Sequence, residues 1–176
     1  MNASLYEQLA AERSKANIAI VAHWAGTDAR RISDLFQIAF GNCGKVSESA
    51  MWTLLVVADR NDGILDKYAS QIVDSLDRLS PSGMRRMACR ILMVSHVPDE
   101  LDGQIVDFCF RMLEKVDEPI GVKTNCLSLI AHRLRKYPEL KQELTTAIDI
   151  ISETSSTSGF RSRLKNLGLV ESQVED

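Results

Sequence analysis

The sequence predicts an all-α fold of the α-α superhelix class, in which about nine or ten helices form antiparallel pairs stacked in a row. Three observations support this prediction. Apolar residues recur at steps of three and four along most of the 176 residues, as they do on one face of a helix. Glycine (9) and proline (4) are scarce, which favours helices over a turn-rich β architecture. Equivalent residues also recur every 37 or 38 positions.

The segment before Asp28 is expected to be helical and to cap one end of the stack. Its apolar residues keep helical spacings at Leu5, Leu9, Ile18, Val21, Ala22 and Trp24. The next helix is predicted over Ile32–Phe40, where Ile32, Leu35, Phe36, Ala39 and Phe40 share one face. The Thr27-Asp28 pair is expected to open that helix as its N-cap.

Three later segments repeat this pattern of one apolar face and one polar face. They are Ile64–Leu79, Asp99–Val116 and Leu140–Ile151. In Asp99–Val116 the apolar stripe includes Leu113 and Val116 at its end. Each segment is therefore predicted to be an amphipathic helix that buries one side.

Helices of a second kind are predicted between these segments. Met51–Ala58 and Cys89–Val94 are apolar nearly all round, and Cys126–Ala131 is almost so. Such runs also fit buried strands, but their flanks extend the helical period to about 14 residues, which strands rarely reach. We therefore expect helices that neighbours cover on most sides.

Proline marks the predicted helix boundaries. Ser80-Pro81 places a hydroxyl before a proline, the favoured start of a helix, and Glu118-Pro119 is similar. Pro98 and Pro138 each follow one helix and open the next. The implied connections are short, so consecutive helices should pack antiparallel.

The two kinds of helix alternate with a fixed period. Met84, Val122 and Phe160 are separated by 38 positions each, and basic residues follow them directly at Arg85, Lys123 and Arg161. A period in the high thirties with two helices per unit is typical of an α-solenoid. Neighbouring pairs would then share one continuous core.

The segment Asp117–Ile130 resembles the second helix of a HEAT repeat, in which an aspartate and a proline lead into a Val-Arg or Val-Lys pair. Gly83–Leu92 is a looser copy without the aspartate, and Gly159–Leu167 is similar to a shortened last copy. The copy around Glu48 has an acid at the basic position. The resemblance covers residues 28–167 and implies a HEAT-like or armadillo-type stack, without implying an activity.

Residues 1–168 are predicted to form a single helical domain, and residues 169–176 a flexible acidic tail. Free cysteines bury readily, so Cys43, Cys89, Cys109 and Cys126 are interpreted as reduced core residues. The histidines lack metal-ligand spacing, no run approaches the length of a membrane span, and no secretion signal begins the chain. We expect a cytoplasmic location, no metal and no cofactor.

Basic residues at the starts of the second helices are the first candidates for function. Arg85, Lys123 and Arg161 fit a structural role, bonding acids or carbonyls of the adjoining repeat. Arg86 and Arg90 lie one turn apart on another face and are better binding candidates. The alternative is a cationic ladder for an acidic partner, and the candidate partner-binding residues are Arg86, Arg90, Lys123, Arg161 and Trp52.

The two tryptophans, Trp24 and Trp52, lie within apolar helical patterns and are interpreted first as core residues. A groove tryptophan would instead grip a peptide or stack on a base. The basic segment at the end of the Cys126–Ala131 helix is interpreted as a solvated helix end, which the helix dipole favours. It contains His132, Arg133, Arg135, Lys136 and Tyr137.

The leading functional hypothesis is a non-enzymatic interaction module that binds a protein segment on its concave helical face. No catalytic motif is found. The alternative is nucleic-acid binding, because some DNA-alkylation-repair glycosylases are built from HEAT-like repeats with a cationic groove. Here Trp52 would supply the aromatic group, and the cations would be Arg30, Arg31, Arg86, Arg90, Lys123 and Arg161. A small-molecule enzyme and a subunit of a homo-oligomer are the remaining hypotheses, and the net charge of −3 disfavours general polyanion binding.

Overall fold

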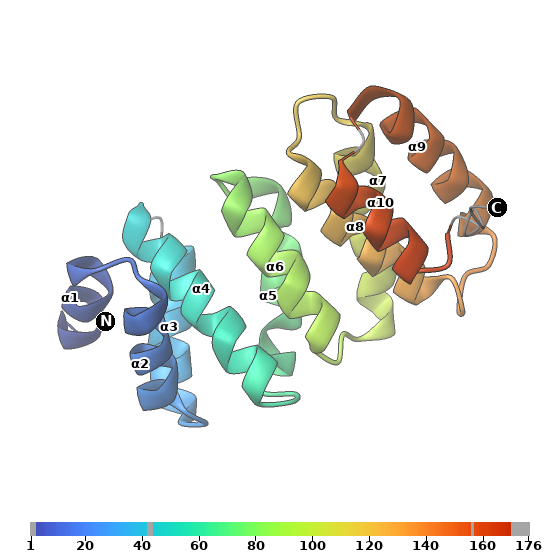
Figure 1. Ribbon diagram of the computed structural model, residues 1–176. Coiled ribbons are helices and arrows are strands. Elements are labelled where there is room, and N and C mark those ends of the chain that lie inside the picture. The colour runs from blue at the N-terminus through green and yellow to red at the C-terminus, as the bar shows by residue number, and fades with distance from the viewer. Residues whose placement is uncertain (1–2, 42–43, 156, 170–176) are drawn as a thin grey trace. The chain divides into compact units, whose positions relative to one another are not determined.

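The computed structural model describes residues 3–41, 44–155 and 157–169. Within these ranges the chain forms ten α-helices and three short 3₁₀ helices, with no strand (Figure 1). The all-α prediction is confirmed.

Helix packing divides the molecule into two compact units, residues 1–97 (unit 1) and residues 98–176 (unit 2). Unit 1 contains α1 (Ala3–Ala11), α2 (Lys15–Ala25), α3 (Ala29–Phe40), α4 (Lys45–Arg60), η1 (Asp66–Tyr68), α5 (Ala69–Ser75), η2 (Leu76–Arg78) and α6 (Ser82–Val94). Unit 2 contains η3 (Asp99–Leu101), α7 (Asp102–Glu114), α8 (Ile120–Arg133), α9 (Leu140–Ser155) and α10 (Ser158–Asn166).

Successive helices pair, and the second helices of the pairs also pack on one another. In unit 1, α3 packs against α4, and α4 lies between α2 and α6 (Figure 1). In unit 2, α7 packs against α8, α8 contacts α10, and α7 contacts α9. Each unit therefore contains a row of second helices, which are α2, α4 and α6 in unit 1 and α8 and α10 in unit 2.

The helices that the sequence marks as apolar all round are the most deeply buried. In α8, every residue from Val122 to Ile130 except Thr124 is buried. In α4, Ala50, Met51 and Thr53 are also almost inaccessible. Because other helices pack against several sides of α4 and α8, these helices cannot present a wide polar face. Cys89, Cys109 and Cys126 are buried, as expected of small apolar side chains, whereas Cys43 lies outside the described residues.

The predicted N-cap of α3 is confirmed. The Asp28 carboxylate accepts hydrogen bonds from the backbone N–H groups of Arg30 and Arg31, at 3.0 and 2.9 Å. The bond from Arg31 is the main reason that the pKa of Asp28 lies below its ordinary value. The predicted capping by Ser80 and Glu118 is wrong. Pro81 and Pro119 are themselves the N-cap residues of α6 and α8, and neither cap has a side-chain hydrogen bond.

The predicted helix Ile64–Leu79 is broken into η1, α5 and η2. Gly63, with φ of +70°, turns the chain just before this segment. Further along, the Ser75 hydroxyl donates to the Gln71 carbonyl at 2.7 Å, where α5 gives way to 3₁₀ geometry. Such back-bonding by serine competes with the helical hydrogen bonds and bends a helix.

The predicted helix Asp99–Val116 begins as η3 and ends at Glu114. Val116 is 93% exposed, so its place in the apolar stripe is a wrong prediction. The backbone of Lys115 is already extended, so α7 ends before the position of Val116.

The single domain proposed for residues 1–168 stays a prediction. The proposed acidic tail falls almost entirely on residues 170–176, which lie outside the described residues.

Candidate functional site

Trp52 lies on the outward stripe of α4. Apart from the exposed last residue, Arg60, the least buried residues of this helix are spaced by three or four positions, and the others are in the core. This stripe consists of Lys45, Glu48, Trp52, Val56 and Asp59. Trp52 is half-buried, so its ring is held by packing while part of it meets solvent. That combination is typical of anchor residues at protein interfaces.

Ion pairs connect this stripe to the neighbouring segments of unit 1. Arg90 of α6 approaches the Asp59 carboxylate at 3.2 Å. Arg13, which precedes α2, lies 2.5 Å from the Glu48 carboxylate. Both arginines are about half exposed, so these pairs add little to stability. They do place charged groups on both sides of Trp52 along α4.

Arg86 and Arg90 both lie on the exposed face of α6, as the sequence indicates. They are one helical turn apart, and Met87, Cys89 and Ile91 between and beside them are buried. Because α6 packs against α4, these two arginines and Trp52 belong to neighbouring helices of one row. Unit 1 therefore contains three of the five predicted partner-binding residues, on two helices that pack against each other.

Lys123 and Arg161 belong to unit 2 and differ strongly in exposure. Lys123 is only 5% exposed, and its ammonium group donates to the Leu113 carbonyl at 2.9 Å. Burial lowers its pKa, although the charges of Glu118 and Asp117 oppose that shift. Lys123 thus offers no accessible charge to a partner. Arg161, at the equivalent position of α10, is exposed.

Arg85 and Lys123 share a structural role that the sequence only partly predicts. The Arg85 guanidinium donates to the Leu79 carbonyl at 2.6 Å, just as Lys123 donates to that of Leu113. Both acceptors lie at the end of the first helix of the same pair, not in the adjoining repeat. The basic residue therefore ties the two helices of its own pair together, by satisfying a carbonyl that a helix end leaves unbonded.

Trp24 is 38% exposed, so its interpretation as a core residue is wrong. On α2 the buried face is formed by Ile18, Val21, Ala22 and Ala25, and Trp24 lies at the edge of that face. The Arg31 guanidinium lies 4.6 Å from the centre of the Trp24 ring, and it also donates to the Trp24 carbonyl at 2.6 Å. The ring is thus held by a cation–π contact at the surface.

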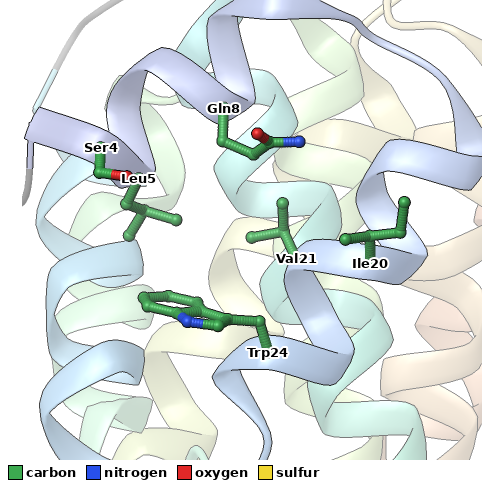
Figure 2. Close-up of a pocket in the computed structure, with 6 residues that line it drawn as sticks. All are labelled: Ser4, Leu5, Gln8, Ile20, Val21 and Trp24. Carbon is green, nitrogen blue, oxygen red and sulfur yellow. The ribbon is translucent and has the colours of Figure 1, made fainter.

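A pocket of about 290 Å³ lies between α1 and α2 (Figure 2). The lining residues carry no charge and are Ser4, Leu5, Gln8, Ile20, Val21 and Trp24. Figure 2 shows the Trp24 ring below Leu5, with Gln8 above Val21. Ile20 is 61% exposed at the edge. An apolar recess with an exposed aliphatic side chain and an indole ring fits an apolar side chain of a ligand.

The basic end of α8 is not a solvated cap, which corrects the prediction. Three of its five residues converge on Asp102 at the start of α7: Arg133 at 2.7 Å, Lys136 at 3.1 Å and the Tyr137 hydroxyl at 3.2 Å. Asp102 is 7% exposed. Burial opposes its ionisation, yet the bonds from Lys136 and Arg133 outweigh burial and hold its pKa below the usual value. The hydrogen bond from Lys136 to Asp99 contributes most to raising the pKa of Lys136.

The described part of the chain contains no group of three or more side chains able to hold a metal ion. None of its helices is long and apolar enough to cross a bilayer.

The helix pairs and their rows define an α-solenoid, a class built by stacking similar two-helix units. Residues 5–169 match the HEAT repeat domain family, and the chain belongs to that family. The match begins before the region that the sequence resemblance covered, so α1 and α2 are part of the repeat domain. The comparisons found no similar curated protein and no similar solved structure.

Proposed function

We propose that the protein is a non-enzymatic interaction module that binds a partner protein on the second-helix row of unit 1. The partly exposed Trp52 ring, between the charged groups of α4, is the observation that carries this proposal. Arg86 and Arg90 add exposed cations on α6, which packs against α4. HEAT repeat domains are generally protein-interaction scaffolds, which supports the class of function.

Pre-organisation would be the source of affinity. Trp52 is packed on a helix whose neighbouring residues are buried, so ordering it in a complex costs little conformational entropy. Arg90 is already oriented by Asp59. A tryptophan and two arginines are among the residue types that dominate interface energetics, particularly when the surrounding contacts exclude water.

Affinity capture from extracts of the source cells, with quantitative mass spectrometry, tests this proposal. Wild-type protein should retain a defined set of partners that Trp52→Ala and the double variant Arg86→Glu/Arg90→Glu lose. Trp52→Phe should keep part of the binding, because an aromatic ring remains.

The matched control is Lys67→Glu/Lys141→Glu, which changes the charge equally on exposed first-helix segments. It should retain the wild-type partners. Circular dichroism checks that each variant remains helical. If folded Trp52→Ala and Arg86→Glu/Arg90→Glu captured the same partners as the wild type, this surface would not be the binding site.

A further inference from the structure

Charge is divided between the two helix rows of each unit. In unit 1, the second helices α2, α4 and α6 contain six basic and two acidic residues, whereas the first-helix segments α1, α3, η1, α5 and η2 contain four basic and five acidic residues. In unit 2, α8 and α10 contain five basic and no acidic residues, whereas η3, α7 and α9 contain two basic and eight acidic residues. The second helices are thus cationic in a chain with a net charge of −3.

The second-helix row of unit 1 presents basic side chains at its surface. Its two acids, Glu48 and Asp59, are already engaged by Arg13 and Arg90. Lys15, Lys45, Arg60 and Arg86 of the same row are exposed. Groups of one sign on one face attract a partner of the opposite sign and increase the rate of encounter.

The apolar pocket between α1 and α2 lies at one edge of this row, because α2 packs against α4. No charged side chain lines the pocket, but the Arg31 guanidinium stacks on Trp24 at its rim. A ligand group that enters the pocket therefore needs to be apolar, and the residues flanking that group meet cations.

We infer that the partner of unit 1 is an acidic amphipathic helix, which places an apolar side chain in the α1–α2 pocket and its carboxylates along α2, α4 and α6. This inference rests on the proposed function and adds the chemistry of the partner. Helix axes pack roughly 8–10 Å apart, so the row from α2 to α6 spans about 20 Å. A helix of about 13 residues covers that distance at 1.5 Å per residue.

The lining of the pocket favours a protein segment over a nucleic acid. The pocket is lined by aliphatic and aromatic carbon beside two neutral polar side chains, a composition suited to a leucine or similar side chain.

A synthetic 16-residue helical peptide, with leucines at helical spacing and glutamates elsewhere, tests the inference by fluorescence anisotropy. The matched peptide carries lysine in place of every glutamate. The glutamate peptide should bind the wild type at least tenfold more tightly than the lysine peptide, and its affinity should fall as salt concentration rises. Arg86→Glu/Arg90→Glu should weaken binding at least tenfold.

The pocket is tested by Ile20→Gln, which should weaken binding of the glutamate peptide several-fold. Its control is Ile150→Gln, because Ile150 on α9 has a similar exposure, 56% against 61%, and this variant should bind as the wild type does. Equal binding of the two peptides, no effect of Ile20→Gln, or displacement of the peptide by lower concentrations of single-stranded DNA would each overturn the inference. Partner capture that depends on Trp52 would still support the proposed function in any of these cases.

Discussion

A lysine and an aspartate show how single buried charges contribute to this fold. The ammonium group of Lys123 donates to the Leu113 carbonyl, and Asp102 accepts hydrogen bonds from three residues at the end of α8 and just after it. A buried charge is tolerated when hydrogen bonds replace its hydration. Both residues connect α7 with α8, so they hold one helix pair together at different points.

Two substitutions of Lys123 distinguish the effect of its charge on stability from the effect of its side-chain volume. Lys123→Met keeps the length of the side chain and removes both the buried charge and one hydrogen bond, so we expect a loss of only about 1 kcal/mol in the free energy of unfolding. Lys123→Glu places an acid near Glu118 and Asp117 and should cost at least about 3 kcal/mol. Urea denaturation measures both, and equal losses would contradict this account.

Asp102→Asn should destabilise the protein by about 2–4 kcal/mol at neutral pH, because Arg133 and Lys136 lose their shared anion. The pKa of Asp102 is lower in the folded state than in the unfolded state. Its stabilising contribution is therefore complete above the unfolded pKa of about 3.9 and is lost as the pH falls through the lower folded value.

Urea denaturation of wild type and Asp102→Asn across this pH range measures the effect. The two stability curves should converge below about pH 4. A difference that stays constant down to the acid limit would show that the ionised carboxylate is not the stabilising group.

At the scale of helices, sequence periodicity predicts where elements lie better than how they begin and end. The apolar stripes that contain Leu35, Ile105 and Leu144 correctly predict helices. Residues on the buried face of a helix recur every three or four positions, and the sequence shows that spacing directly. The break at Ser75 was not predicted, since it depends on whether a hydroxyl bonds its own helix.

Contacts between residues that are far apart in the sequence could not be predicted either. Asp102 meets Arg133 and Lys136 across 31 and 34 positions, and no local pattern marks such a pair. Likewise, the sequence of α2 places Trp24 among apolar residues, but it does not predict that the Trp24 ring stays partly exposed. Arg86 and Arg90 could be predicted to share one face of a helix, because their spacing of four positions decides it. That this face is exposed follows only from the structure.

The N-cap of α3 gives a prediction at this scale. Asp28→Ala leaves the N–H groups of Arg30 and Arg31 without their acceptor and should lower the urea midpoint of unfolding. Asp28→Ser should recover most of the loss, because serine is also a good N-cap. If alanine and serine lowered the midpoint equally, the effect would not come from capping.

At the scale of the molecule, unit 1 contains the complete proposed surface: Trp52, Arg86, Arg90 and the α1–α2 pocket. In solenoids, each repeat depends mainly on its immediate neighbours. We therefore expect residues 1–97 alone to be helical and to unfold cooperatively in urea, with a smaller m-value than the full chain because less surface becomes exposed. Circular dichroism measures this, and a gradual transition without cooperativity would contradict it.

Both tryptophans of the chain, Trp24 and Trp52, belong to residues 1–97, and both are partly open to solvent. Their near-ultraviolet emission therefore reports on this half of the chain alone. The polarity around each indole changes when a binder covers it, and Trp24→Phe or Trp52→Phe leaves a single emitting ring. Fluorescence titration of the unlabelled protein can thus assign ligand binding to the pocket or to the α4 stripe. Residues 98–176 contain no tryptophan and contribute nothing to this signal.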